Sequence, residues 1–178
     1  MVGPAFMDWT MNRRVAGPMG NRHPLGVAAP HGVFPCSGED RWISIAVLEE
    51  SEWRGLVAAM GAPDWASAAE LASHAARLEN LDALHERLSE WTRRHDDREL
   101  AARLQRHGVA AAPVLNVADL LGDPHYVARK TFIEVRHPLG FSETIYGAYV
   151  KNSRTPARVE PGPAIGRDNE HVFRELLG

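Results

Sequence analysis

The first thirty residues are the strongest constraint on the fold, because glycine and proline interrupt them too often for a long helix or strand. Proline removes a backbone donor and glycine adds conformational freedom, so neither supports a long regular element. We expect a linker and a loop, with one helical turn around residues 6–11 and regular structure only from His31 onward. The breakers are Gly3, Pro4, Gly17, Pro18, Gly20, Pro24, Gly26 and Pro30.

Several later segments show the patterns of β-strands. Residues 31–36 and 41–47 flank a glycine-containing turn and carry β-branched and aromatic side chains, which predicts a β-hairpin. Residues 132–138 and 143–150 predict a second hairpin in the same way. The run 109–115 is short, apolar and contains a proline, which suits an edge strand better than a central one.

Apolar residues spaced three and four positions apart predict helices in the middle of the chain. One helix begins near Ser51 and ends at Gly61, two lie within residues 67–94 with a break near Asn80, and another begins after Asp96 as its cap. Strands followed by helices, without strict alternation of the two, indicate an α+β fold.

The C-terminal region predicts short helices and an extended linker. Asn116 and Asp123 can each cap a short helix, and residues 153–167 are irregular and rich in proline and glycine. Asp168 can cap a last helix that carries an apolar stripe. Such a helix must dock on a surface, and no docking surface is evident within this sequence.

Composition excludes several classes of function. The formal net charge is −3 with acidic and basic residues interspersed, so there is no basic stripe for nucleic acid. No uninterrupted apolar stretch approaches the ~20 residues that cross a bilayer. Cys36 is the single cysteine, which excludes an internal disulfide and fits a small buried side chain in a reducing compartment. We expect a soluble, cytoplasmic protein that binds neither nucleic acid nor membrane.

Known catalytic motifs are absent from the sequence. It has no GxSxG elbow, no phosphate-binding GxxxxGK loop, no GxGxxG after a strand and no paired cysteines. His23 and His31 are too far apart, in a segment full of breakers, to be helical metal ligands, so we expect no metal site. We interpret the remaining histidines of the helical region as solvated or capping residues: His74, His85, His95 and His107.

An acidic cluster lies where a strand meets the start of a helix. Glu49, Glu50 and Glu52 suit the positive end of the helix dipole, and this alone explains their position. The alternative hypothesis is that Glu50 lines a site as an acid or base.

The ordered motifs of residues 18–178 resemble family III CoA-transferases, the CaiB/BaiF family of formyl-CoA transferase, L-carnitine CoA-transferase and α-methylacyl-CoA racemase. The segments that carry the resemblance are GNRHPLGVAAPHGVFPCSGEDRWISIAV, SEWRGLVAAMGAPDW, RLENLDALHERLSEWT, GVAAAPVLNVADLLGDPH, HPLG and IGRDNEHVFRELLG. Single segments are weak signals, but their order and spacing make the match specific.

The resemblance implies a fold for the chain and an assembly. Residues 1–24 would lead from a Rossmann-like large domain, residues 25–130 would form the small α+β domain, and residues 131–178 would return toward the large domain. Members of the family form interlocked dimers, so the partner would be a second copy or an N-terminal half.

The resemblance also implies the chemistry. The family transfers CoA between an acyl-CoA and a carboxylic acid through a nucleophilic aspartate in the N-terminal half, with the CoA thioester as substrate and no tightly bound cofactor. No residue of this sequence matches that aspartate, and Asp8 lies after the point where it would come. We therefore expect the chain to be a C-terminal part that is inactive alone.

A substrate loop can be carried over by position. Residues 22–29 replace the glycine-rich loop of the formyl-CoA member and hold one glycine, which argues against formyl-CoA and oxalate as substrates. Glu50 lies where racemases of the family place a glutamate, but the surrounding GAIEP-type motif is absent. The residues assigned to the substrate loop are Gly20, Asn21, Arg22, His23, Gly26, Pro30 and His31.

Two other functions remain open. The chain could be a non-catalytic assembly or dimerisation module with apolar surfaces for a partner, or part of an acyl-CoA racemase or hydratase of the same family.

Overall fold

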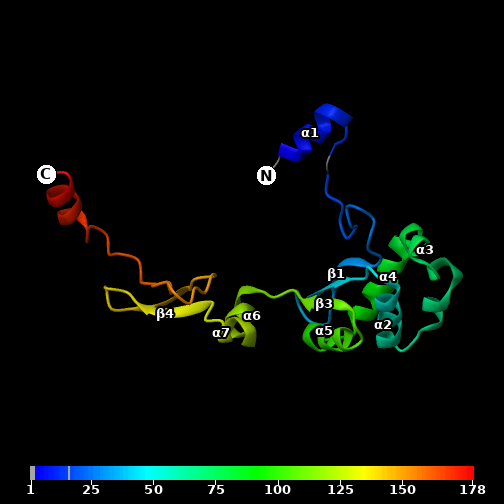
Figure 1. Cartoon of the computed structure of the whole chain (residues 1–178). Coiled ribbons are helices and arrows are strands. Elements are labelled where there is room, and N and C mark those ends of the chain that lie inside the picture. The colour runs from blue at the N-terminus through cyan, green and yellow to red at the C-terminus, as the bar shows by residue number, and fades with distance from the viewer. Residues whose placement is uncertain (1–2, 16) are drawn as a thin grey trace. The chain divides into compact units, whose positions relative to one another are not determined.

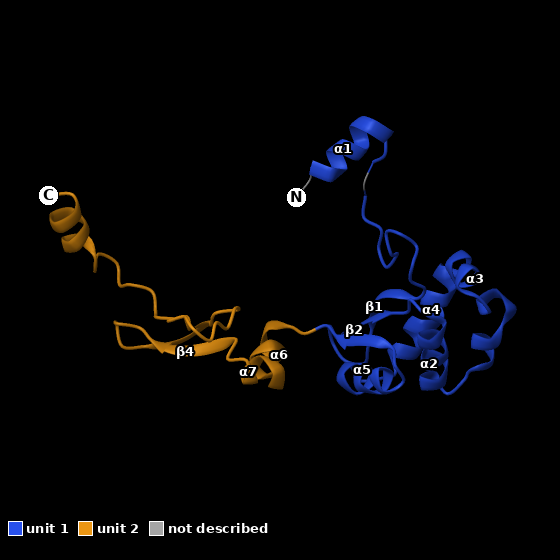
Figure 2. Ribbon diagram, in the orientation of Figure 1, with its two compact units in different colours: residues 1–114 blue, residues 115–178 orange. Residues whose placement is uncertain are grey.

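A computed structural model describes residues 3–15 and 17–178 (Figure 1). The chain divides into two compact units, Met1–Val114 and Leu115–Gly178 (Figure 2). The first unit holds a sheet with helices, and the second holds short helices and a separate hairpin. Mixed helices and small antiparallel sheets confirm the predicted α+β class. The division into leading, small-domain and returning segments concerns the arrangement of a whole enzyme and stays a prediction.

The sheet of the first unit has three antiparallel strands in the order β1 (His31–Pro35), β2 (Trp42–Ala46) and β3 (Ala110–Pro113). In this register Val33 lies opposite Ser44. The first predicted hairpin is therefore confirmed. The short apolar run with its proline is an edge strand, as predicted, because β3 pairs with β2 alone.

Side chains alternate between the two faces of this sheet. Phe34, Ile43 and Ile45 are buried on one face, while Val33 and Trp42 on the other face are 41% and 38% exposed. Successive residues of a strand point to opposite faces, so one face joins the core and the other does not.

Helices cover the buried face. Helices α4 (Leu81–Thr92) and α5 (Asp97–Arg106) contact the sheet, and α2 (Glu50–Met60) packs against α5 (Figure 1). All three contribute buried leucines to one core. The shared core consists of Phe34, Ile43, Ile45, Val47, Leu56, Leu84, Leu88, Leu100 and Leu104, each at most 2% exposed. The helices predicted from apolar spacing are therefore those that close the core.

Two helical predictions need correction. The single turn expected near the start is a ten-residue helix, α1 (Gly3–Asn12), because its proline lies in the first turn, where no backbone donor is needed. The region expected to form two helices begins with two 3₁₀ turns, Asp64–Ser67 and Ala69–Leu71, and its first α-helix, α3 (His74–Glu79), is short. The break at Asn80 is confirmed.

A buried ion pair joins the β1–β2 turn to the start of α5. Asp97 is fully buried, and its Oδ2 lies 2.8 Å from Nη2 of Arg41. Removing one partner of such a pair leaves an uncompensated charge in the interior. Cys36 lies nearby, 6% exposed, and burial with the Asp97 charge raises the pKa of its thiol to about 11, which confirms the expectation of a buried side chain.

The second unit holds the predicted caps and the second predicted hairpin. Asn116 caps α6 and Asp123 caps α7 through backbone amides of the first turn. Asp168 is different, because its carboxylate accepts from Arg167 and the last helix begins after it. The elements are α6 (Val117–Gly122), α7 (Pro124–Ala128), the antiparallel pair β4 (Phe132–Arg136) and β5 (Ser142–Tyr146), and a π-helical segment, His171–Leu176.

Among the helices formed by residues 3–15 and 17–178, none has the length and apolarity that a membrane span requires.

Helices α2 and α5 approach closely at Gly55, where a Cβ atom would lie 2.1 Å from the carbonyl oxygen of His107. We expect Gly55→Ala to destabilise the protein by about 1–3 kcal/mol, because the α2 backbone would have to move away from the end of α5. Thermal unfolding followed by circular dichroism measures the change. Gly122→Ala is the matched control, since a Cβ atom there meets open space. Equal melting temperatures for the two variants would contradict the close approach.

Candidate functional site

The residues predicted for the substrate loop lie together in the segment that leads into β1. We call residues 20–31 the 20–31 loop. Its first residue, Gly20, has a positive φ of 59°, and its last residue, His31, begins β1. All seven predicted positions lie in this segment of the first unit because they are neighbours in sequence, while Glu50 lies at the start of α2.

Asn21 fixes the beginning of the loop to β1. Its Nδ2 donates to the carbonyl of Val33 at 2.8 Å, and its Oδ1 accepts from the Val33 amide at 2.9 Å. The side chain thus pairs with β1 as a neighbouring strand would. Gly32 is required beside it, because a Cβ atom there would lie 2.2 Å from Cγ of Asn21 and the φ of 147° disfavours other residues.

The end of the loop joins the sheet. The amide of Ala29 donates to the carbonyl of Val47 at 2.9 Å, and the amide of Val47 donates to the carbonyl of Pro30 at 2.9 Å. These bonds continue the β1–β2 ladder into the loop. Ala28, Ala29 and Pro30 are buried, so this end is the firmest part of the loop.

Between these anchors the loop turns sharply and projects outward. The amide of Gly26 donates to the carbonyl of His23 at 3.0 Å, and the amide of Leu25 donates to Nδ1 of His23 at 3.2 Å. Leu25 is 79% exposed at the tip. Arg22 lies 2.6 Å from Asp82 of α4, but this pair is exposed and contributes little stability.

Three histidines meet where the loop crosses α4. The rings of His23 and His31 lie edge to face with centroids 5.2 Å apart, and Nε2 of His85 accepts a long hydrogen bond, 3.5 Å, from the His31 amide. His85 also packs edge to face on Phe34 at 5.2 Å. The buried Nδ1 of His31 has no hydrogen-bond partner in the described part of the chain, an arrangement that costs free energy.

His85 was predicted to be solvated or capping, and this prediction is wrong. It is half-buried between Phe34 and the loop, and burial lowers the pKa of its imidazole. The charge of Asp82 raises the pKa of His85, while the charges of Arg22 and His31 lower it further. His95 is also half-buried, against Trp91, and burial lowers its pKa too.

His107 fits the prediction, since it is exposed and forms the C-terminal cap of α5.

The acidic cluster divides into two roles. Glu52 closes the start of α2, because its Oε2 accepts from the amides of Leu48 and Glu49 at 2.6 and 3.0 Å. Glu49 is the N-cap residue. The interpretation of these acids as helix-starting residues is confirmed for this pair.

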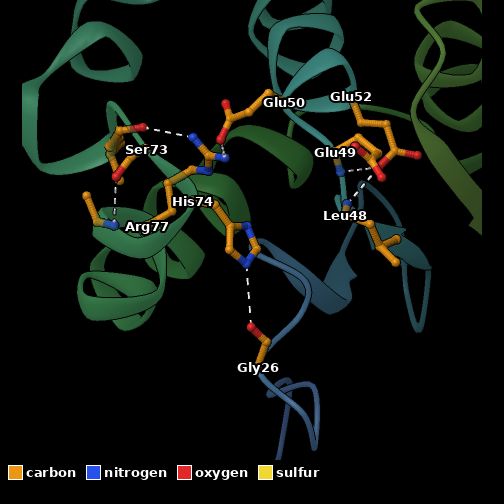
Figure 3. A network of polar contacts seen from close by, with 10 residues as sticks. Gly26, Leu48, Glu49, Glu50, Glu52, Ser73, His74 and Arg77 are labelled. Atoms are coloured by element: carbon orange, nitrogen blue, oxygen red, sulfur yellow. Dashed lines mark hydrogen bonds and ion pairs between the residues drawn. The ribbon is translucent and has the colours of Figure 1, made fainter.

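Glu50 has a different partner, the buried side chain of Arg77 in α3 (Figure 3). Arg77 is fully buried, and its Nη2 lies 2.5 Å from Oε1 of Glu50. Its Nη1 donates to the carbonyl of Leu71 at 3.1 Å, and its guanidinium lies 4.7 Å from the ring centroid of Trp53. A buried guanidinium needs such partners, so Glu50 is required where it is.

This pairing affects the proton chemistry of Glu50. The hydrogen bond from Arg77 holds the pKa of the carboxyl below its ordinary value of 4.5, and the backbone amide of His74 lowers it as well. A carboxylate of lowered pKa is a weaker base. The environment of Glu50 therefore favours a structural role over an acid–base role, and its place in catalysis stays a prediction.

His74 connects this ion pair to the loop. It is the first residue of α3, and its Nε2 lies 3.4 Å from the carbonyl oxygen of Gly26 (Figure 3). Carbonyl oxygens only accept hydrogen bonds, so Nε2 of His74 carries the hydrogen. The prediction that His74 is solvated or capping is therefore incomplete.

Sequence reasoning missed the side chains that hold the loop from behind. Arg77, His74, His85 and Asp82 lie on helices with mixed polar faces, where nothing in the spacing separates a buried polar residue from a solvated one. Asn21 was selected through the family resemblance of its segment and not through a local pattern. No group of three or more candidate metal ligands occurs within residues 3–15 and 17–178.

Comparison with known proteins shows which enzyme family this chain is similar to. The model of CoA-transferase family III matches residues 1–169. A probable CoA-transferase of Mycobacterium tuberculosis is 32% identical over 152 residues, which cover 83% of this chain and 19% of that protein. A formyl-CoA:oxalate CoA-transferase of Rhodopseudomonas palustris is 31% identical over 156 residues, covering 86% of this chain and 37% of that protein.

Solved structures agree with the sequence comparison. A CaiB/BaiF family protein from Brucella suis superposes with a TM-score of 0.81 at 25% identity, over 99% of this chain and 44% of that one. The chain thus spans less than half the length of each of these three relatives.

The depressed pKa of His85 predicts a dependence of stability on pH. The unfolded chain binds a proton at the ordinary histidine value of 6.5, whereas the folded chain binds it only at lower pH. The contribution of His85 is therefore complete above pH 6.5 and is lost as the pH falls through the folded value. We expect His85→Gln, which keeps an acceptor without titrating, to lose less thermal stability than the wild type between about pH 7.5 and about pH 5.5.

Thermal unfolding at the two pH values measures this difference. Burial also lowers the pKa of His95, so the stability of the His85→Gln variant still falls to some extent as the pH decreases. His107→Gln, at an exposed position, serves as the control and should behave as the wild type does. An unchanged pH dependence in His85→Gln would contradict the assignment.

Proposed function

Since this chain belongs to CoA-transferase family III, we propose that it supplies the small-domain part of an enzyme that transfers CoA between an acyl-CoA and a carboxylic acid. The CoA thioester is then a substrate, and no tightly bound cofactor is needed. The observation that carries the proposal is the 20–31 loop, fixed at both ends with an exposed tip.

The anchoring of this loop suits a substrate-covering role. Asn21 and Gly32 determine where the loop leaves the sheet, and the ladder at Ala29 determines where it returns. A short turn held at both ends can keep a defined position while its tip meets a ligand. We propose that Gly20, Asn21, Arg22, His23, Gly26, Pro30 and His31 form the substrate loop of the complete enzyme.

The nucleophile has to come from elsewhere. Covalent transfer of CoA requires an activated carboxylate, and no residue of this sequence matches the aspartate that the family uses. Oε1 of Glu50 pairs with the buried Arg77, which argues against a nucleophilic role for this carboxylate. We propose that the chain is inactive alone and that an N-terminal half, on the same or another polypeptide, completes the site.

The second unit supports the need for a partner. Phe173, Leu176 and Leu177 of the C-terminal segment are each more than 60% exposed, and Phe141 in the β4–β5 turn is half-exposed. Large apolar side chains that are exposed in the isolated chain are often covered in an assembly. A homodimer or an N-terminal half is the proposed partner, and the buried lone cysteine is consistent with a cytoplasmic location.

These exposed residues also support the second candidate, a non-catalytic assembly module. One experiment distinguishes the two functions. Part of a CoA-transferase should support CoA exchange when an N-terminal half with the family's aspartate is added, whereas an assembly module should not. A racemase is the weaker alternative, because the lowered pKa of Glu50 does not suit exchange of an α-proton.

The test combines this chain with a separately produced N-terminal half of a family member. We expect no CoA exchange by the 178-residue chain alone and measurable exchange from an acyl-CoA to a carboxylic acid by the combination. Exchange is followed by chromatography of the CoA thioesters over a panel of acids.

Replacing the aspartate of the added half by alanine is the control, and it should abolish exchange. Activity of the chain alone would overturn the missing-nucleophile argument. A stable complex without exchange would favour the assembly module.

A further inference from the structure

Among the residues that the structure describes, one hydrogen bond joins the tip of the 20–31 loop to a helix, the contact between Gly26 and His74. Asn21 and Ala29 hold the two ends to the sheet, and Arg22 pairs with α4 through exposed side chains. The turn at Gly26 is otherwise closed by bonds within the loop itself. The position of the tip therefore depends on where His74 is held.

His74 is held by the start of a short helix. Helix α3 spans six residues, too few to be stable from its own hydrogen bonds. Its place is fixed by Arg77, which is fully buried, lies on the ring of Trp53 and pairs with Glu50 of α2. Ser73 caps the helix through the amide of Ala76.

Glu50 acts on the histidine through Arg77. Its carboxylate pairs with Arg77, which lies about one helical turn after His74 in α3. Figure 3 shows the His74 ring extending from this network toward Gly26. A path of contacts therefore leads from Glu50 through Arg77 and α3 to His74 and the loop tip.

We propose that His74 is a positioning residue for the 20–31 loop, held in place by the Glu50–Arg77 ion pair. This inference rests on the proposed function, because a loop held in this way would present its tip to an acyl-CoA. Glu50 would then hold His74 in place through Arg77 and would not contact the reacting atoms.

Hydrogen exchange of the full 178-residue chain, measured by mass spectrometry without substrate, tests the contact. We expect His74→Ala to raise exchange in residues 23–27 by about five- to tenfold, the effect of losing one hydrogen bond, with no change in β2 or α4. His74→Gln should restore protection, because its side-chain amide can donate to the Gly26 carbonyl.

Glu50→Gln tests the second step, and it should raise exchange in both α3 and the loop. Glu79→Gln is the matched control, an exposed acid on the same helix, and it should leave the loop unchanged. Loop exchange equal to wild type in His74→Ala, or failure of His74→Gln to restore it, overturns the proposal. Faster exchange throughout β2 in His74→Ala also overturns it, because that would indicate a general structural role.

A kinetic measurement separates this inference from the proposed function. In the complex with an added N-terminal half, His74→Ala should lower kcat/KM for acyl-CoA and His74→Gln should restore it. The proposed function fails when the wild-type complex is inactive, and the exchange experiment still decides the role of His74. When loop exchange responds to His74→Ala but kcat/KM does not, His74 positions the loop, and the claim that this loop presents its tip to an acyl-CoA fails.

Discussion

The sheet of the first unit has one face that must be covered, and this requirement organises the rest of the unit. Three strands bury Phe34, Ile43 and Ile45 on one side, and helices α2, α4 and α5 supply the opposing leucines. Burying each large aliphatic side chain contributes about 1.5–3 kcal/mol. Because the helices must lie on this face, the residues at their starts and edges become available to hold the loop that enters β1.

Residue pattern was sufficient for most of the fold. Alternation located both hairpins, and the proline and small residues of Ala110–Pro113 placed that strand at an edge. Three predicted N-caps are confirmed, because the side chains of Asp96, Asn116 and Asp123 accept hydrogen bonds from backbone amides at the predicted helix starts. These features depend on residues close in sequence, so a single sequence contains the information.

The parts that escaped prediction depend on residues distant in sequence. Arg77 lies in a helix where an arginine is ordinarily solvated, and only the folded chain shows that Trp53 and Glu50 enclose it. His85 likewise has no local signal, because its partners are Phe34 and the His31 amide. Glu50 was selected from the acidic cluster as a candidate acid or base. The pattern could not distinguish a carboxylate that pairs with a buried arginine from one that meets a substrate.

The two histidines that touch the loop require opposite proton positions, and this has a structural consequence. His85 accepts at Nε2 from the His31 amide, so a proton at that nitrogen removes the contact. His74 donates from Nε2 to the Gly26 carbonyl. We therefore expect acidification to weaken the His85 contact where the loop joins β1. The ladder bonds of Ala29, Pro30 and Val47 at this end do not titrate and keep the loop joined to the sheet.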